Sequence, residues 1–300
     1  ESQIYLFARG VPFINNQNYS TIAKVKNFTQ ETEYIPYARI SDFGANKNIA
    51  WANCTTVLNC LSIVHSKITM ATSKGTHSSH RINHLASRLQ LKSYLEVGVA
   101  SGDTFFAVDI VDKVAVDPKF RFDYRSYENE STHFFEIPSD VYFTKFSKGE
   151  KFDVIFLDGL HTFEQTFRDF CSSLMVAHDR TVWLIDDTMP SDVFSAWPKQ
   201  MQAVNFRKQA GLTGDQWHVD VFKFVFAIHD FFPMLSYLTI NTAGNPQTLI
   251  WKESRSEFTP LYNNLESITR LSYFDLLQKI DFMNMMHQDA ALSEVLSFFK

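Results

Sequence analysis

Apolar runs and helical segments alternate between residues 79 and 187, and this alternation limits the fold more strongly than any other feature of the sequence. Two segments, 79–91 and 162–177, place apolar residues at helical spacing. Four shorter runs are nearly continuous in apolar residues: SYLEVGV (93–99), KVAVD (113–117), KFDVIFLD (151–158) and TVWLIDD (181–187). Such strands, separated by helices, are typical of a parallel sheet that is covered on both faces. The sequence therefore predicts an α/β fold with a Rossmann-like, doubly wound and mostly parallel sheet.

The predicted domain continues beyond residue 187. An irregular segment with prolines and glycines precedes a helical stretch at 215–230. Two β-like runs within 235–252 flank a Gly-Asn-Pro turn, which indicates a closing antiparallel hairpin. Apolar residues at helical spacing in 254–300 predict a helical tail. We therefore divide the chain into an N-terminal extension of unclear structure (1–77), an α/β domain (78–253) and the tail (254–300).

Composition and charge argue against several classes of protein. The 300 residues carry a net charge of −5 with a pI near 6.1, whereas proteins that follow a phosphate backbone usually carry a positive field. No apolar run approaches the roughly 20 residues of a membrane-spanning helix, and the first residues lack a secretory signal pattern. Three cysteines are few and odd in number, which does not fit a disulfide framework. We expect a soluble cytoplasmic protein that binds neither nucleic acid nor membrane.

The stretch YLEVGVASGDTFFAV (94–108) places two glycines between the first predicted strand and the helix after it. In an open α/β sheet this turn lies where ligands bind, and glycines let the backbone pass close to a ligand while the helix N-terminus offers free N–H groups. A tight turn without a ligand is the alternative. Ala100 stands where a dinucleotide fingerprint needs its second glycine, which disfavours a nicotinamide oxidoreductase.

The pattern Glu96-x-Gly98-x-x-x-Gly102 resembles the first motif of class I S-adenosylmethionine-dependent methyltransferases. The resemblance implies that these three residues bind the cofactor. It also implies that Asp117, at the end of the second predicted strand, accepts hydrogen bonds from the ribose hydroxyls, as an acidic residue at this place can. Asp140, in PSDVYF, lies near the adenine by the same analogy, with a turn residue as the equal alternative. Glu96 could instead cap a turn.

Three carboxylates follow two further predicted strands. Asp158 ends one strand, and Asp186 and Asp187 end the next. If the strands are neighbours, these side chains converge, and they would repel one another or take up protons unless a cation neutralises them. An all-oxygen set suits Mg²⁺. Asp158 and Asp187 could alternatively cap a helix and a turn, which are common uses of aspartate.

His161 lies three residues after Asp158, where the next helix begins. A neutral imidazole can remove a proton from a hydroxyl that a metal has acidified. Together with the carboxylates it indicates an O-methyltransferase in which His161 is the base. The alternative is a hydrogen-bonded loop histidine.

A narrower resemblance supports this hypothesis. The segments DGLHTFEQTFRDF, LIDDTMP, PSDVYF and TGDQW look like the branch that contains macrolide-sugar O-methyltransferases and the cephalosporin-hydroxylase protein, over roughly residues 80 to 252. The branch implies metal ligands at Asp158, Asp186 and Asp187 and a base at His161. It also implies a small-molecule acceptor, such as a sugar or another polyhydroxylated compound.

Other functions stay open at this point. One is a hydroxylase-type enzyme on the same scaffold, since fold does not fix chemistry; another is a non-catalytic cofactor-binding or assembly protein. A homo-oligomer is possible. A zinc site on His77, His80 and His84 is conceivable but has no indicated fourth ligand. Trp217 and His218 could border the substrate cleft, although a packed tryptophan at a helix start is the simpler interpretation.

Overall fold

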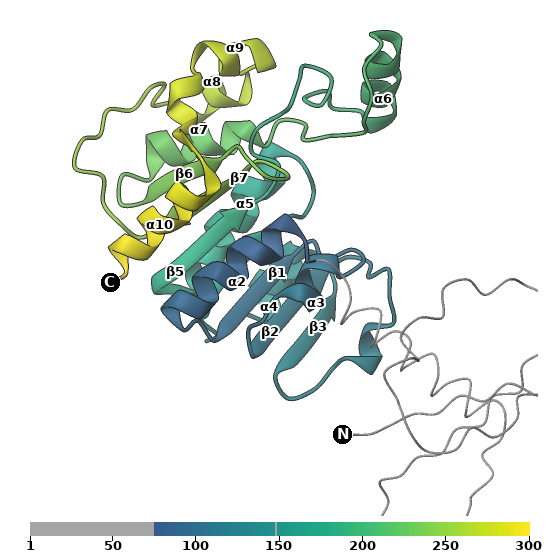
Figure 1. Cartoon of the computed structure of the whole chain (residues 1–300), viewed down its shortest axis with the longest axis vertical. Helices are drawn as coiled ribbons and strands as arrows, with labels where there is room; N and C mark the ends of the chain where they lie inside the picture. Colours follow the sequence, from purple (N-terminus) through teal and green to yellow (C-terminus); the bar gives the residue numbers. More distant parts are fainter. Residues whose placement is uncertain (1–74, 148) are drawn as a thin grey trace, which may run out of the picture. The chain divides into compact units, whose positions relative to one another are not determined.

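The computed structural model describes residues 75–147 and 149–300, and its centre is one eight-stranded sheet with the order β3-β2-β1-β4-β5-β7-β6-β8 (Figure 1). The five strands from β3 to β5 are parallel, β7 is antiparallel to β5 and β6, and β8 is parallel to β6. The strands are β1 (Ser93–Val97), β2 (Asp112–Asp117), β3 (Thr132–Glu136), β4 (Phe152–Leu157), β5 (Ala177–Ile185), β6 (Ser236–Ile240), β7 (Gln247–Trp251) and β8 (Met285–Met286). The predicted mostly parallel sheet with a closing hairpin is confirmed.

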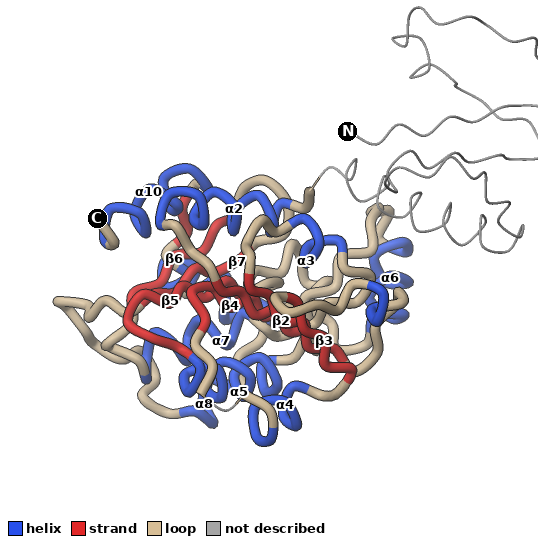
Figure 2. The backbone as a smooth tube through the Cα atoms, turned by 90° about the horizontal axis from the view of Figure 1, so that it is seen from below, coloured by secondary structure: helices blue, strands red, loops and turns tan. Residues whose placement is uncertain are grey.

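Helices cover both faces of the sheet. Figure 2 shows α2, α3 and α10 on one side of the strands and α4, α5 and α8 on the other. The α-helices are α2 (His77–Leu89), α3 (Asp103–Ala107), α4 (Ser139–Lys145), α5 (Phe163–Ser173), α6 (Gln200–Gln209), α7 (Phe222–Phe231), α8 (Leu265–Thr269), α9 (Tyr273–Gln278) and α10 (Gln288–Phe298). Short 3₁₀ turns lie at Tyr124–Ser126, Leu174–Val176 and Ile280–Met283. The arrangement is the doubly wound one that the sequence predicts.

Two apolar clusters hold these layers together. In β4, Ile155 and Leu157 face the cluster under α5 and α7, while Val154 and Phe156 face the cluster under α2 and α10. All four side chains are buried, so successive residues of the strand are covered on opposite faces. This is the physical reason for the continuous apolar runs from which the strands were predicted.

Some elements differ from the sequence-based prediction. The strand β3 and the helix α6 were not predicted, and α7 begins at Phe222 although the helical pattern begins at residue 215. The predicted helical tail is present but broken into α8, α9, a 3₁₀ turn, β8 and α10. The contact of α10 with α2, and the pairing of β8 with β6, bring the last residues back onto the sheet.

The predicted extension over residues 1–77 lies outside the described residues except for 75–77, and its boundary stays a prediction, as does the boundary at 253. None of the described helices is both long and apolar enough to cross a membrane.

The strand register brings the chemically important residues to one edge. Val97 pairs with Val116 and Leu157, and Leu157 pairs with Ile185. The residues that follow these strands therefore leave the sheet side by side, at its carboxyl edge.

Candidate functional site

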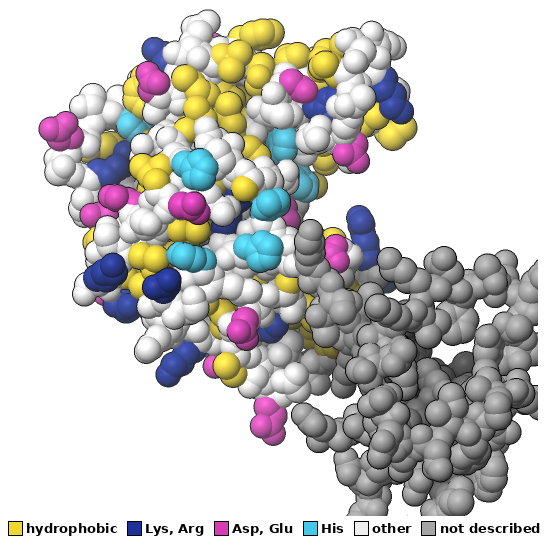
Figure 3. All heavy atoms as spheres, viewed as in Figure 1, with side chains coloured by type: hydrophobic (Ala, Val, Ile, Leu, Met, Phe, Trp, Pro, Cys, Tyr) yellow, Lys and Arg dark blue, Asp and Glu magenta, His cyan; other side chains and the backbone are white. Residues whose placement is uncertain are grey.

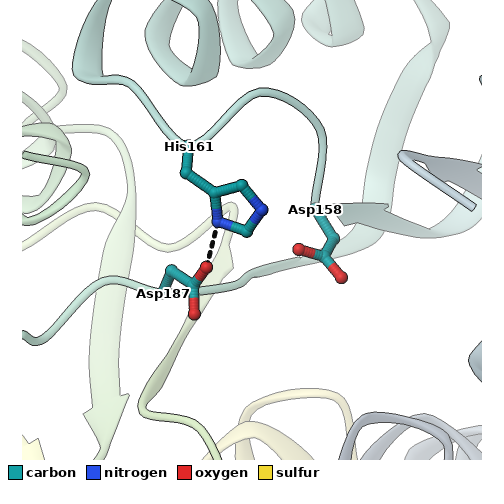
Figure 4. A group of neighbouring side chains, drawn as sticks. All are labelled: Asp158, His161 and Asp187. Carbon is teal, nitrogen blue, oxygen red and sulfur yellow. Dashed lines mark hydrogen bonds and ion pairs between the residues drawn. The ribbon is translucent and has the colours of Figure 1, made fainter. Parts of the chain in front are cut away.

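Asp158, His161 and Asp187 meet at this carboxyl edge (Figure 4). Asp158 follows β4, His161 lies in the turn before α5, and Asp187 follows β5. One ligand atom from each residue lies within 4.8 Å of the other two. The structure thus brings together three of the four residues in which the sequence predicts metal ligands and a base.

The imidazole of His161 lies between the two carboxylates. Its Nδ1 is hydrogen-bonded to Oδ2 of Asp187, and Figure 4 shows the other ring nitrogen on the side of Asp158. Burial alone would lower the pKa of His161, but the bond to Asp187 and the charges of Asp187 and Asp186 outweigh it, so the pKa is raised. A carboxylate at Nδ1 holds the proton there and leaves Nε2 free as an acceptor.

Asp187 is held on both oxygens and has an uncommon backbone conformation. Its φ of +58° is left-handed, which aspartate tolerates better than most residues. While Oδ2 meets His161, Oδ1 accepts a hydrogen bond from Nδ2 of Asn245 at 2.9 Å and lies 3.5 Å from Nε2 of His218. The side chain is almost fully buried. Its orientation is therefore fixed from several sides.

Asp186 is adjacent to this group and differs in its contacts. Its Oδ1 accepts the backbone N–H of Asp187 at 2.9 Å and Nε2 of Gln247 at 3.1 Å. Burial and the charge of Asp187 raise the pKa of Asp186 to about 6. Asp186 does not belong to the group of three, although its carboxyl lies close enough to that of Asp158 to raise the pKa of Asp158.

The group carries more negative charge than a partly buried site tolerates. Burial, together with the charges of Asp186 and Asp187, raises the pKa of Asp158 well above its usual range. Near-neutral pH therefore favours either a bound proton or a bound cation here. Carboxylate oxygens are the ligands that Mg²⁺ prefers, and an imidazole can serve other divalent ions, so the donor set fits a divalent cation.

The glycine turn after β1 is shaped partly by neighbouring protein atoms. Gly98 has φ +90°, and a Cβ placed on it would lie 1.9 Å from the backbone oxygen of Asp158. Gly102 has φ +83° and precedes α3, where a Cβ would lie 2.5 Å from the ring of Phe106. Both glycines are therefore required by the fold itself.

Asp117 and Glu96 flank this turn. Asp117 accepts the backbone N–H of Ala100 at 2.8 Å on Oδ2 and that of Lys119 at 2.7 Å on Oδ1, which fixes its carboxylate beside the glycines. Each oxygen keeps a second lone pair for a ligand. Glu96 is buried, accepts the hydroxyl of Tyr94 at 2.6 Å, and has its pKa raised to about 8, mainly by burial.

Asp140 lies at the start of α4 and points to α5. Its Oδ2 is 3.1 Å from Nη1 of Arg168, and both side chains are about half exposed. Gln165 also approaches Asp140 and bridges to Ser139 and Asp169. The predicted contact of Asp140 with the adenine stays a prediction.

Several residues of the site carry no local sequence signal. Asn245 and Gln247 flank the Pro of the β6–β7 turn, which the sequence indicates only as a turn, and Arg81 lies in α2 among ordinary helical residues. Trp217, which the sequence left between two interpretations, has its ring centroid 5.7 Å from that of His161. Its Nε1 donates to the backbone oxygen of Trp197 at 2.9 Å.

The segment between β5 and α7 borders the site. It leaves the sheet at Asp187, carries α6, and returns through Trp217 and His218. Figure 1 shows α6 standing apart from the layers, and Figure 3 shows the surface hollowed beneath it. Figure 3 also shows histidine side chains gathered over α2; His77, His80 and His84 are exposed there and do not form a group with metal-binding spacing.

The sheet order, the glycine turn and the acidic residue at the end of β2 are those of a Rossmann-like methyltransferase fold. Residues 95–188, from β1 to just beyond β5, match the model of a family described as a methyltransferase domain. This segment of the chain is therefore similar to that methyltransferase family, and the family resemblance seen in the sequence is confirmed. No curated protein matches the chain.

Solved structures give a weaker likeness. An O-methyltransferase from Bacillus cereus in complex with SAH is 14% identical, with 66% of this chain and 90% of that chain covered and a TM-score of 0.41. The SAH-bound methyltransferase PaMTH1 of Podospora anserina is 15% identical, with 69% and 100% covered and a TM-score of 0.41. The O-methyltransferase TomG of Streptomyces achromogenes, in complex with SAM, is 16% identical, with 58% and 79% covered and a TM-score of 0.36. Scores this low support no conclusion about chemistry.

Proposed function

We propose that the chain transfers the methyl group of S-adenosylmethionine to a hydroxyl oxygen of a small molecule, with His161 as the general base and Mg²⁺ as a cofactor. The observation that carries the proposal is the contact of His161 with Asp187 next to Asp158, at the carboxyl edge of a methyltransferase domain. Cofactor and acceptor would meet at this edge of the sheet.

The cofactor side of the proposal rests on five residues. Gly98 and Gly102 form the turn beside which the cofactor would lie, and Asp117 would offer its free lone pairs to the ribose hydroxyls. Glu96 stands behind this turn as a buried carboxyl. Asp140, at the start of α4, is the residue we assign to the adenine end.

The acceptor side rests on His161. Its Nε2 takes the proton of the acceptor hydroxyl while the oxygen forms a bond to the methyl carbon. The carbon–sulfur bond breaks at the same time, its electron pair stays on sulfur, and S-adenosylhomocysteine leaves. Asp187 stabilises the imidazolium that results, because it already accepts the Nδ1–H. Holding oxygen and methyl in line supplies much of the rate.

We assign Asp158 and Asp187 as the residues that hold Mg²⁺, with Asp186 contributing the oxygen that faces Asp158. When bound, the ion supplies a Lewis acid that lowers the pKa of the acceptor hydroxyl. What supports this assignment is that burial, followed by repulsion from the neighbouring carboxyls, raises the pKa of Asp158 and Asp186.

The acceptor we propose is a sugar or another polyhydroxylated small molecule. The sequence resemblance supports this class. Half-buried Trp217, beside the base, offers an aromatic face of the kind on which a sugar ring can pack. A homo-oligomer and a cytoplasmic location remain predictions from the sequence.

The first experiment is calorimetric titration of the full chain with S-adenosylmethionine and with S-adenosylhomocysteine, each with and without Mg²⁺, with NAD as the control ligand. We expect both sulfur nucleotides to bind and NAD not to bind. A second experiment follows transfer of a radiolabelled methyl group to a panel of sugars and sugar nucleotides, with and without EDTA. Binding without transfer to any hydroxyl, or transfer that EDTA leaves unchanged, would contradict the acceptor or the metal part of the proposal respectively.

A further inference from the structure

The guanidinium of Arg81 joins three segments behind the acidic group. Arg81 lies in α2 with no exposed surface. Each of its five N–H donors has a partner, which is the full capacity of an arginine. The partners are Gln288 Oε1 at 2.9 Å, the backbone oxygens of Asn245 at 2.9 Å and Thr242 at 2.9 Å, the backbone oxygen of Ala243, and Oε1 of Gln247. The cation thus fixes the turn between β6 and β7 and the start of α10.

Asn245 of that turn and Gln247, the first residue of β7, donate hydrogen bonds from their side-chain amides to Asp187 and Asp186. Asn245 donates Nδ2 to Oδ1 of Asp187 at 2.9 Å, and Gln247 donates Nε2 to Oδ1 of Asp186 at 3.1 Å and to Oγ of Ser78 at 2.7 Å. Because Arg81 occupies Oε1 of Gln247, the amide can turn only its NH₂ group toward Asp186. Arg81 therefore orients the Gln247 amide so that its NH₂ group, and not its oxygen, faces the carboxylate of Asp186.

We infer that Arg81, Asn245 and Gln247 are positioning residues for Asp186 and Asp187. They act through the two carboxylates without touching a ligand. One oxygen of each acid is held by an amide, so the other oxygen is directed toward Asp158 and His161. This inference rests on the proposed function, because it concerns the cation affinity of the site proposed there. Donors in the shell outside metal ligands commonly affect affinity by about 10- to 100-fold.

A purely structural clamp would give a different result. If Arg81 only tied α2 to the β6–β7 turn and α10, weakening the clamp would lower stability and leave the cation affinity of the folded protein unchanged. The exposed side chain of Asn245 separates the two roles, because its removal leaves the buried contacts of Arg81 in place.

The test is a titration of the full chain with Mn²⁺, followed by the electron paramagnetic resonance signal of free Mn²⁺ in the presence of S-adenosylhomocysteine. The variants are N245A, Q247A and R81K, each with a matched control. N241A removes an exposed asparagine of the same turn whose side chain contacts Met285, and R88K changes an exposed arginine of the same helix. We expect N245A to weaken Mn²⁺ binding by about 10-fold and R81K by at least as much, with both controls within about twofold of the wild type.

The outcomes separate this inference from the proposed function. If N245A and Q247A fold, bind S-adenosylhomocysteine normally and bind Mn²⁺ as tightly as the wild type, the inference is wrong while the metal site stands. If the wild-type chain binds no Mn²⁺, the metal part of the proposed function and this inference are both wrong. If R81K does not fold, the Mn²⁺ affinity of N245A alone tests the inference.

Discussion

At Asp187 the backbone adopts φ +58°, and the side chain meets His161 on one oxygen and Asn245 on the other. A left-handed residue other than glycine costs of order 1 to 3 kcal/mol and persists where its surroundings determine it. Here the turn places the carboxylate between the histidine and the β6–β7 hairpin. The left-handed backbone of Asp187 and its side-chain contacts with His161 and Asn245 therefore depend on each other.

The substitution Asp187→Asn tests the role of the charge. Asparagine tolerates the same backbone conformation, so we expect the fold to be retained. The neutral amide cannot stabilise an imidazolium as a carboxylate does, and methyl transfer should fall by about 10²- to 10⁴-fold. Radiolabel transfer measures the rate, and calorimetry should find S-adenosylhomocysteine affinity within about twofold of the wild type. Parallel loss of both would identify Asp187 as a folding residue.

Gly98 provides a prediction about stability. In Gly98→Ala the new Cβ would lie 1.9 Å from the backbone oxygen of Asp158, so β1 and β4 would have to separate. We expect a loss of about 4 kcal/mol or more in the free energy of unfolding, measured by urea denaturation. Gly149 is the matched control, because it has φ +82° but no atom within 4 Å of its Cβ position. Gly149→Ala should cost about 1 to 2 kcal/mol; equal costs at both positions would contradict the steric argument.

Gly98 also shows what a sequence motif can hide. The sequence predicts this glycine in the turn after the first strand, and the structure places it in that turn. The neighbouring strand alone already excludes a side chain, which the sequence could not show because Asp158 is 60 positions away along the chain. The motif predicts the turn correctly without revealing which contact requires the glycine.

The elements that the sequence predicts well are those buried on both faces. β1, β4 and residues 181–185 of β5 are nearly continuous apolar runs because helices cover both faces of the sheet there. β3 was missed because most of its residues are only partly buried at the edge of the sheet. α6 was missed because only Ala203 and Arg207 are buried in it, which leaves no apolar stripe to detect.

The segment carrying α6 depends on Arg207. Nη2 of this buried arginine lies 2.9 Å from both carboxylate oxygens of Asp192, and Nη1 donates to the backbone oxygen of Gln216 at 3.1 Å. These contacts join the outgoing and returning parts of the segment between β5 and α7.

We expect Arg207→Gln to open this segment locally, since it leaves the Asp192 carboxylate without its bidentate partner. Limited proteolysis should cut the variant within residues 197–215 several times faster than the wild type, while the Tm of the protein changes little. Lys208→Gln, at the exposed neighbouring position, is the control. If both variants are cut at the wild-type rate, Arg207 does not hold the segment closed.

The molecule as a whole should be less stable at alkaline pH. The pKa of Glu96 is raised to about 8 and that of Asp186 and Asp169 to about 6, in each case mainly by burial. A carboxyl with a raised pKa keeps its proton in the folded protein after the unfolded chain has lost it. The free energy of unfolding therefore falls as the pH rises from about 4.5 through 8.

Glu96→Gln tests this pH dependence, since glutamine keeps the shape and can still accept the hydroxyl of Tyr94. One pKa unit corresponds to about 1.4 kcal/mol, so ionisation of Glu96 should lower the free energy of unfolding by on the order of 5 kcal/mol above pH 8. We expect the wild-type Tm to fall between pH 6 and 9 and the variant to show a shallower fall, in thermal unfolding scans at matched ionic strength. Identical slopes for both proteins would show that Glu96 ionises normally.

At the scale of the whole molecule, the sequence predicts the acidic residues of the site but not the residues that hold them in position. Asp158, Asp186 and Asp187 follow neighbouring strands, so parallel topology alone places them together. Arg81 comes from α2, Asn245 from the β6–β7 turn and Gln247 from the start of β7, and their contacts depend on side-chain packing between distant segments. No local pattern in the sequence encodes such contacts.

The short strand β8 has a further consequence for the sheet. It pairs Met285 and Met286 with Thr239 and Ile240, and the N–H of Thr239 donates to the backbone oxygen of Asn284 at 3.1 Å. Unpaired backbone groups at a sheet edge invite a strand from another molecule. Because β8 occupies this position, the outer side of β6 is shielded from such intermolecular pairing. Such pairing has more backbone to use at β3, the five-residue strand at the opposite edge of the described sheet, than at the two-residue β8.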